Sequence, residues 1–258
     1  MTAFVRSADG TQIAFTRSGA GPPVVFVGGG LDDGTENGPL AAALSEWFTV
    51  VNYARRGRGA SGDTPPYAVD RELEDLTALL ATVSAAAHLF GASSGGALAL
   101  RAAAAGLPVA RVAVYEVPYF TDEAARAAWL SYVDDLVGSL AADCRGDAVA
   151  SFMRLAGAGE AEIEAARAAP VWRSLEALAP TLAYDAACLA DGRVPAESLA
   201  SVTQPVLVAT GALDPFFAPA ADALTAALPA AQRLMLEHPG HVADPAILAP
   251  VLRRFYLS

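Results

Sequence analysis

Residues 89–98, Leu-Phe-Gly-Ala-Ser-Ser-Gly-Gly-Ala-Leu, constrain the fold of this chain more than any other stretch. An apolar run leads into Gly-x-Ser-x-Gly at residues 91–95, and an alanine-rich helical pattern follows. This order predicts a strand, a sharp turn and a helix, in which small residues leave room for a strained backbone at Ser93. The Ser93 hydroxyl would stand clear of the sheet, beside helix N-terminal amides that favour developing negative charge. The stretch therefore predicts a nucleophilic serine.

The same pattern has a plainer interpretation, a glycine-rich helix start that is capped by Ser93. Gly-x-Ser-x-Gly is a weak signal by itself in a chain rich in glycine, alanine and serine. The apolar run before it and the helical pattern after it favour the nucleophile. A nucleophilic serine also requires a base, an acid that orients the base, and an oxyanion hole, so the rest of the chain must supply these groups.

The size, composition and charge of the chain narrow the classes of protein to which it can belong. With 258 residues, of which 54% are hydrophobic and 17% charged, it suits one large α/β domain or a domain with an insertion. A formal net charge of −11 argues against nucleic acids and anionic membranes as partners. Cys144 and Cys188 lack the spacing of metal ligands, so we expect free thiols and no metal site.

The sequence shows neither a signal peptide nor a membrane-spanning segment, and this indicates the cellular compartment. The N-terminal residues lack the apolar segment of a signal peptide, and no run of about 18 uncharged apolar residues could cross a membrane. We therefore expect a cytoplasmic protein without a membrane partner, either a monomer or a homodimer.

Apolar runs of strand length alternate with helical patterns in residues 1–117 and again in residues 200–258. The expected strands cover residues 3–7, 12–17, 24–27, 48–53, 88–90, 109–115, 204–210 and 233–237. This alternation predicts an α/β fold with a mostly parallel central sheet flanked by helices, in which ligands bind beyond the carboxyl ends of the strands. In residues 118–199 the alternation stops and helical patterns dominate, which predicts an all-helical insertion.

The residue types of a catalytic triad follow three of these strands. Ser93 follows the run at residues 88–90, Asp214 follows the run at residues 204–210, and His241 follows the last strand. The chemistry requires a hydroxyl nucleophile, an imidazole that takes its proton and a carboxylate that orients the imidazole. We therefore expect the three side chains at one edge of the sheet, in the chain order Ser, Asp, His.

Gly28, Gly29 and Gly30 follow the buried run at residues 24–27. Glycines in such a place let the backbone approach closely and leave amides free, as an oxyanion hole requires. An ordinary flexible loop is the alternative, and these residues considered alone favour it.

Taken together, these motifs resemble those of the α/β-hydrolase fold superfamily. The resemblance extends over nearly the whole chain and rests on residues 24–31, 53–63, 91–96, 210–215 and 240–245. It implies an α/β-hydrolase core formed by residues 1–117 and 200–258, with residues 118–199 as the family's helical cap.

The same resemblance implies a role for each candidate. Ser93 would be the nucleophile, Asp214 the acid and His241 the base. The backbone amides of Ser94 and of the preceding glycine loop, most directly that of Gly30, would form the oxyanion hole. Many members of the family have His-Gly where this chain has Gly-Gly at the start of that loop.

Two of these roles have competitors. Some members of the family carry the acid after an earlier strand, which makes Glu116 the alternative to Asp214. His238 is the alternative base, but the Gly-His-Val-Ala-Asp-Pro context favours His241. His88 starts a buried strand and is expected to be structural.

The predicted substrate site combines the glycine loop with the aromatic residues of the cap. It comprises Gly29, Leu31, Trp129, Tyr132, Trp172 and Tyr184. For any one of the cap aromatics, packing in the cap's own core is an equal alternative. Asp32 and Asp33 could line the same pocket, although a helix cap or plain exposure is expected for them.

Three arginines, at positions 55, 56 and 58, follow the expected strand at residues 48–53. They could form an anion site. The acidic balance of the chain instead favours a solvated loop in which they are paired with carboxylates.

We expect a cofactor-free serine hydrolase that cleaves an ester, thioester or lactone bond of a small, mainly apolar molecule. Two other functions are open on such a fold. One is an enzyme that acts on an epoxide or a C–C bond, and the other is a small-molecule receptor without activity. A serine at position 93 argues against haloalkane dehalogenases and typical epoxide hydrolases, which need a carboxylate there, and an intact triad argues against a receptor.

Overall fold

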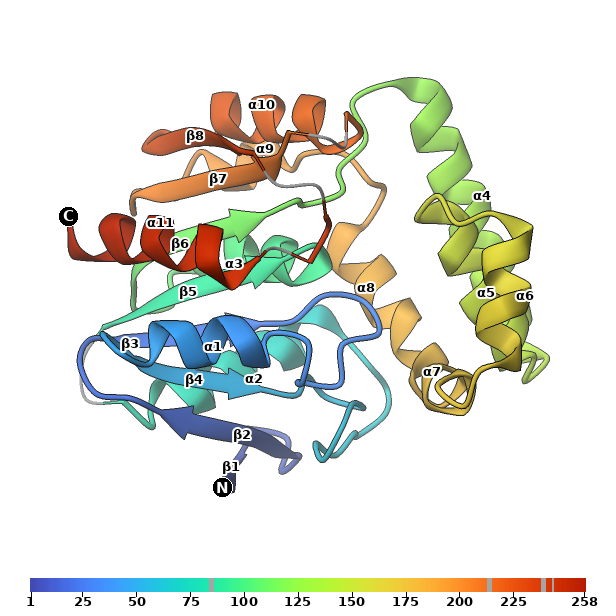
Figure 1. Ribbon diagram of the computed structural model, residues 1–258, viewed down its shortest axis with the longest axis horizontal. Coiled ribbons are helices and arrows are strands. Elements are labelled where there is room, and N and C mark those ends of the chain that lie inside the picture. Colours follow the sequence, from blue (N-terminus) through green and yellow to red (C-terminus); the bar gives the residue numbers. More distant parts are fainter. Residues whose placement is uncertain (84–85, 213–214, 238–239, 243) are drawn as a thin grey trace.

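One sheet of eight strands forms the centre of the computed structural model, which describes residues 1–83, 86–212, 215–237, 240–242 and 244–258 (Figure 1). Across the sheet the strands run in the order β1-β2-β4-β3-β5-β6-β7-β8. Their bounds are β1 (Thr2–Arg6), β2 (Gln12–Ser18), β3 (Pro23–Val27), β4 (Thr49–Tyr53), β5 (Ala87–Ala92), β6 (Val109–Tyr115), β7 (Val206–Gly211) and β8 (Ala231–Leu236). β2 pairs antiparallel with β1 and β4, and every pair from β4 to β8 is parallel. The predicted mostly parallel sheet is confirmed.

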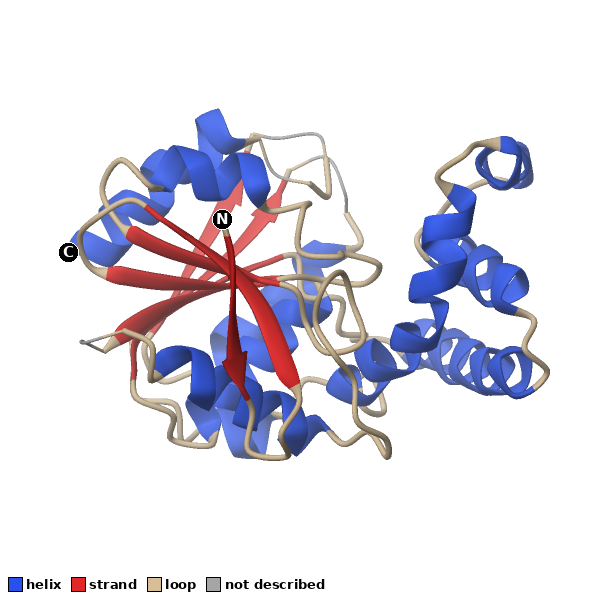
Figure 2. Ribbon diagram, turned by 90° about the horizontal axis from the view of Figure 1, so that it is seen from below, coloured by secondary structure: helices blue, strands red, loops and turns tan. Residues whose placement is uncertain are grey.

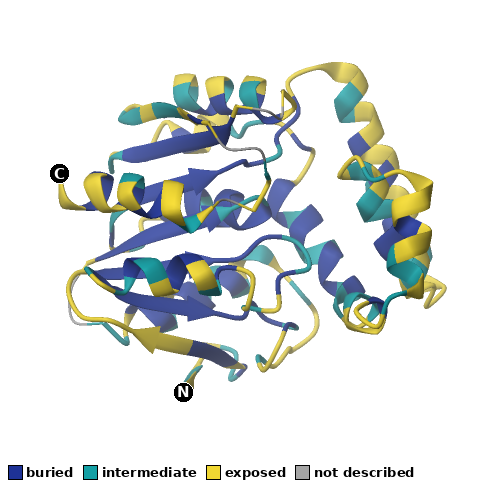
Figure 3. Cartoon of the chain, viewed as in Figure 1, coloured by how far each residue is buried: buried dark blue, intermediate teal, exposed yellow. Residues whose placement is uncertain are grey.

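Helices cover both faces of the sheet, as Figure 2 shows from below. One face packs against α1 (Gly38–Leu44) and α11 (Pro245–Leu257), and the other packs against α2 (Val69–Leu80), α3 (Ser94–Ala104) and α10 (Phe217–Ala227). In β3, Val24 and Phe26 face the first layer, whereas Val25 and Val27 face the second. Successive strand residues point to opposite faces, so a strand covered on both sides must be apolar throughout. The continuous apolar runs of the sequence therefore became the buried central strands (Figure 3).

The chain between β6 and β7 is helical, as predicted. It forms α4 (Glu123–Ala141), α5 (Arg145–Leu155), α6 (Glu160–Ala168), α7 (Trp172–Leu178), the short 3-10 helix η1 (Ala179–Thr181), α8 (Leu182–Leu189) and α9 (Ala196–Leu199). We call these elements the helical insertion. β6 and β7 still pair directly with each other, with Ala113 opposite Leu207. The insertion therefore leaves the sheet at the end of one strand and returns to its neighbour.

The helical insertion stands beside the edge of the sheet at which the parallel strands end (Figures 1 and 2). Within it, α8 packs against α3 and so connects the insertion to the core. The proposed division into a core and a cap at residues 118 and 199 stays a prediction. Among the residues that the structure describes, no helix is both long and apolar enough to cross a membrane.

Candidate active site

Ser93 occupies the sharp turn between β5 and α3. Its backbone has φ 53° and ψ −129°, a strained conformation for a residue with a side chain. Two hydrogen bonds of 2.9 Å hold it, from the Ser93 N–H to the carbonyl of Tyr115 and from the Gly96 N–H to the carbonyl of Ser93. The predicted strand, turn and helix are all present, and the strain at Ser93 is fixed by its surroundings.

The glycine after the turn is required by close backbone packing. A Cβ added to Gly95 would lie 2.3 Å from the carbonyl oxygen of Val27, at the end of β3. No side-chain movement could relieve that clash, because the opposing atom belongs to the backbone. The Gly-x-Ser-x-Gly motif therefore lets α3 begin directly against the end of a neighbouring strand.

The loop after β3 lies against Ser93. A Cβ added to Gly29 would be 3.0 Å from Cβ of Ser93 and 3.7 Å from its Oγ. The amide of Ser94, the first residue of α3, has no acceptor within the helix, and such an amide is suited to binding an anion. The two predicted sources of oxyanion donors, Gly30 and Ser94, thus lie on segments that both border the serine. Their roles as donors stay predictions.

The residue after the glycine loop, Leu31, is half-buried and has a positive φ of 57°. Asp32 is buried and accepts hydrogen bonds from the amides of Gly34 and Glu36 and from Nδ2 of Asn37. Asp32 therefore shapes the loop as a capping residue does. Its neighbour Asp33 is exposed and accepts from the N–H and hydroxyl of Thr35.

His241 is paired with Glu116. Nδ1 of His241 lies 2.7 Å from Oε2 of Glu116, and the other carboxylate oxygen accepts a 2.9 Å hydrogen bond from the N–H of Gly211. The Glu116 side chain is 1% exposed, whereas that of His241 is 46% exposed. Glu116 also has a positive φ of 50°, so the turn after β6 is strained like the turn after β5. The hydroxyl of Tyr115 donates to the carbonyl of Gly240, which ties the histidine loop to β6 a second time.

The preferred acid, Asp214, lies outside the described residues, as does the alternative base, His238. Their roles stay predictions. Glu116, the alternative acid, occupies the Nδ1 side of the His241 ring, where an orienting carboxylate is required. Sequence reasoning did not find Phe217, whose ring stacks on that of His241 with centroids 5.0 Å apart. The sequence pattern at this point is a pair of phenylalanines a few residues after the end of a strand, and such a pair does not by itself indicate contact with a catalytic histidine.

His88 belongs to the packing of β5. Its ring stacks on Tyr256 at 4.6 Å and meets Phe48 edge-on at 6.3 Å. Burial lowers the pKa of His88 to about 4, and the positive charge of Arg111 acts in the same direction. His88 is therefore a neutral core residue near pH 7, in agreement with the structural role expected for it.

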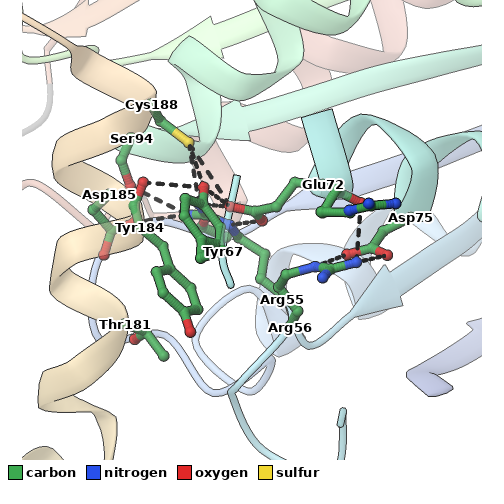
Figure 4. Close-up of polar contacts among 12 residues, drawn as sticks. Arg55, Arg56, Tyr67, Glu72, Asp75, Ser94, Thr181, Tyr184, Asp185 and Cys188 are labelled. Atoms are coloured by element: carbon green, nitrogen blue, oxygen red, sulfur yellow. Dashed lines mark hydrogen bonds and ion pairs between the residues drawn. The ribbon is translucent and has the colours of Figure 1, made fainter. Parts of the chain in front are cut away.

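The arginine cluster is paired with carboxylates, but it is not solvated, and that part of the expectation was wrong (Figure 4). Arg55 forms ion pairs with Glu72 at 2.6 Å and with Asp185 at 2.7 Å, and Arg58 pairs with Asp185 at 2.8 Å. Arg56 pairs with Asp75 at 2.8 Å and with Asp9 at 3.0 Å. Each arginine is at most 1% exposed. The charge pattern predicted the pairing, but α2 and α8 cover the cluster and exclude solvent.

The aromatic residues predicted to bind substrate are packed against other parts of the chain. Trp129 is buried, stacks on Phe120 at 5.5 Å and donates to the carbonyl of Ala190 at 3.1 Å. Tyr132 is also buried, with its ring 5.5 Å from that of Trp129. This packing favours the alternative in which the two residues form the core of the helical insertion. Substrate contact by either stays a prediction.

The other two predicted aromatics lie elsewhere in the insertion. Trp172 is buried beneath the guanidinium of Arg167, which lies 5.0 Å from the ring centroid. Tyr184 stacks on Tyr67 with centroids 3.8 Å apart, and its hydroxyl donates to Asp63. Tyr184 therefore contacts the core from α8. Contact of these two side chains with substrate also stays a prediction.

No group of three or more His, Cys, Asp or Glu among the described residues could hold a metal ion. Two surface hollows lie away from the predicted triad. One, of about 340 Å³, is lined by residues 143–147 and Glu176, and the other, of about 600 Å³, is lined by Trp47 and residues of α11 with Ser258. Neither lining includes Ser93 or His241.

Comparison with known proteins agrees with this architecture. The model of the alpha/beta hydrolase family matches residues 24–251. The crystal structure of an alpha/beta hydrolase from Sphaerobacter thermophilus DSM 20745 is 44% identical, with a TM-score of 0.89 over 98% of this chain and 100% of that chain. The esterase RhEst1 from Rhodococcus sp. ECU1013 has the same fold, with 23% identity and a TM-score of 0.72 over 100% of this chain and 98% of its own.

A curated relative, the uncharacterized hydrolase YraK of Bacillus subtilis (strain 168), is 35% identical over 95 residues. That match covers 35% of this chain and 35% of YraK, so it spans about a third of the relative's length. The family match, in contrast, begins in β3 and ends in α11, and it includes the turns that carry Ser93 and Glu116. The chain belongs to the alpha/beta hydrolase family.

Proposed function

We propose that this protein is a serine hydrolase that cleaves an ester, thioester or lactone bond of a small, mainly apolar molecule. The observation that carries the proposal is the pairing of His241 with the buried Glu116 at the sheet edge that also presents Ser93 in a strained turn. Backbone strain at the ends of two adjacent strands is typical of active sites, where it holds functional side chains in place. The esterase relative from Rhodococcus supports the same reaction class.

In the proposed reaction, Oγ of Ser93 attacks the carbonyl carbon of the substrate and its proton passes to Nε2 of His241. The negative charge that forms on the carbonyl oxygen is stabilised by the amides of Ser94 and Gly30. The leaving alcohol, thiol or lactone oxygen takes the proton from Nε2, which leaves an acyl group on Ser93. Water then attacks this acyl group, with His241 again as the base, and the free serine is restored.

We further propose that Glu116 is the carboxylate that orients His241. A carboxylate on Nδ1 holds the proton on that nitrogen and leaves Nε2 free to accept the proton of Ser93. The hydrogen bond from Gly211 fixes the other oxygen of Glu116, so the carboxylate is held in place before the reaction. Asp214, the initial preference, is the competing acid, and mutation of each residue distinguishes them.

A neutral substrate fits the charges around this site. The guanidiniums of Arg55 and Arg58 are balanced by the carboxylates of Glu72 and Asp185, so they have no charge to spare for a substrate anion. The net charge of −11 also repels anionic molecules at long range. We therefore expect acetyl to medium-chain acyl esters and small lactones to be better substrates than esters that carry a carboxylate.

A fluorophosphonate tests the nucleophile directly, because it reacts with an activated serine and adds a known mass. We expect intact-mass analysis to find one adduct on the wild type and none on Ser93→Ala. Ser201→Ala is the matched control, since Ser201 is exposed at the end of α9, and it should be labelled like the wild type. A folded wild type that forms no adduct and hydrolyses no p-nitrophenyl ester would contradict the proposal.

A further inference from the structure

The side chain of Asp185, in α8 of the helical insertion, joins a buried network of ion pairs and hydrogen bonds (Figure 4). Its carboxylate accepts hydrogen bonds from Nη1 of Arg55 at 2.7 Å and from Oγ of Ser94 at 2.7 Å. Nη2 of Arg58 donates to both carboxylate oxygens at 2.8 Å. Burial by itself would raise the pKa of Asp185, but Arg58 and Arg55 outweigh it and the pKa is lowered. Asp185 is therefore an anion that binds three donors from the core.

The same two arginines also hold the glycine loop. Nη1 of Arg58 donates to the carbonyl oxygen of Gly29, and Nη1 of Arg55 donates to the carbonyl oxygen of Gly28 at 3.3 Å. In a planar trans peptide, the carbonyl and the next N–H point in opposite directions. A bond to the Gly29 carbonyl therefore fixes the direction of the Gly30 N–H, which points away from Arg58.

This fixation is needed because glycine backbones rotate more freely than those of other residues. A loop of three consecutive glycines has no side chains of its own that could hold its peptide planes. Arg58 supplies the restraint from outside the loop, and Asp185 in turn holds Arg58. The second predicted oxyanion donor, the amide of Ser94, is restrained by the same carboxylate through the Ser94 hydroxyl.

We infer that Asp185 is a positioning residue of the hydrolase reaction, which sets both oxyanion donors through Arg58 and Ser94. This inference rests on the proposed function, because an oxyanion hole serves acyl transfer. It assigns the helical insertion a part in the chemistry besides the choice of substrate. Through Asp185 and Arg58, α8 is connected to the glycine loop, and through Asp185 it is connected to the first residue of α3.

A buried ion pair that only stabilises the fold is the competing explanation, and the chain offers a matched control for it. Arg56 and Arg58 lie in the same loop and are both fully buried, and each is paired with a carboxylate. The guanidinium of Arg56 donates to Asp9, to Asp75 and to the carbonyl of Arg71, and these residues lie outside the glycine loop. Lysine keeps the charge but cannot reproduce the planar fork of arginine. Arg58→Lys and Arg56→Lys should thus both lower the melting temperature, but only Arg58→Lys should displace the oxyanion donors.

The experiment measures steady-state hydrolysis of p-nitrophenyl butyrate by Arg58→Lys, Asp185→Asn and Arg56→Lys, after circular dichroism has shown each to be folded. Loss of one oxyanion donor costs about 100- to 1,000-fold in kcat, so misplacement should lower kcat about 10- to 100-fold with little change in KM. We expect this for Arg58→Lys and Asp185→Asn and a near wild-type kcat for Arg56→Lys. Equal kcat values for Arg58→Lys and Arg56→Lys would overturn the inference, whether or not Asp185→Asn folds.

Hydrogen exchange gives a second readout that does not depend on the reaction. Peptides that cover residues 28–31 should exchange faster in Arg58→Lys than in the wild type, and no faster in Arg56→Lys. If the wild type hydrolyses no ester, the proposed function fails, and exchange still decides whether Arg58 and Asp185 hold the loop. Unchanged exchange in Arg58→Lys would overturn the inference in either case.

Discussion

The turns after β5 and β6 place their first residues in the same unusual conformation, yet only one of them has a recognisable sequence. Ser93 has φ 53° and Glu116 has φ 50°. Ser93 is flanked by glycines because α3 starts against a neighbouring strand, whereas Glu116 is followed by Val117 and Pro118. A motif therefore records where backbones crowd together. It does not record backbone strain by itself, because Glu116 has a similar positive φ without glycines beside it.

The largest effect on kcat should come from a substitution of Glu116, in the turn after β6, which has no recognisable sequence motif. Glu116→Gln keeps the size of the side chain but removes the charge that holds the Nδ1 proton of His241, and we expect kcat to fall by about 10⁴. Asp214→Asn is the competing variant and should leave kcat near the wild-type value. Single-turnover measurement with p-nitrophenyl butyrate compares the two. A crippled Asp214→Asn beside an active Glu116→Gln would place the acid after β7.

The second effect is on the free energy of unfolding and concerns Gly95, in the closely packed turn after β5. Gly95→Ala puts a Cβ 2.3 Å from the carbonyl oxygen of Val27, so the backbone must shift, and we expect unfolding to become easier by about 3 kcal/mol. Gly138→Ala, in α4, is the matched control because a Cβ there meets nothing within 4 Å. It should stabilise the protein by about 0.5–1 kcal/mol through helix propensity. Urea denaturation of both variants checks the pair, and similar midpoints would show that crowding does not explain the motif.

His88, at the opposite end of β5 from Ser93, shows what a buried histidine outside the candidate active site contributes to the pH dependence of stability. The unfolded chain binds a proton at His88 below about pH 6.5, but the folded chain does so only near its lowered pKa of about 4. Stability from this residue is therefore complete above pH 6.5 and is lost as the pH falls toward 4, by on the order of 2 kcal/mol. His88→Phe keeps an aromatic ring against Tyr256 and should flatten this part of the pH dependence. Parallel curves for His88→Phe and the wild type between pH 6.5 and 4 would refute the assignment.

Most of the fold could be predicted because its signals are local. A strand buried on both faces must be apolar at each position, so runs such as Val24–Val27 indicate their own conformation. The elbow at Ser93 is also local, since the residues that crowd it include its own sequence neighbours. The helical insertion was predicted from the end of the strand–helix alternation.

The pairing of side chains across long stretches of sequence could not be predicted in this way. Glu116 and His241 are 125 positions apart, and no local pattern shows which carboxylate reaches Nδ1. Arg58 and Asp185 are 127 positions apart. The sequence indicated that the arginines would be neutralised, but their burial depends on α8 folding over them. Contacts between side chains so far apart in the sequence form only when the helices and strands have packed together.

The smallest expected effect concerns Ser94, the residue after the proposed nucleophile Ser93. Ser94→Ala keeps the amide that is proposed as an oxyanion donor and removes only the hydroxyl that donates to Asp185 at 2.7 Å. Arg55 and Arg58 still neutralise the carboxylate, so the loss is that of a single charge-assisted hydrogen bond, about 1.5–3 kcal/mol. Because the backbone of α3 also restrains the amide, we expect kcat to fall about three- to tenfold, with KM unchanged and with full labelling by the fluorophosphonate at long times. Ser201→Ala should not change kcat. A Ser94→Ala protein with wild-type kcat would show that the backbone of α3 positions this amide without help from the Ser94 hydroxyl.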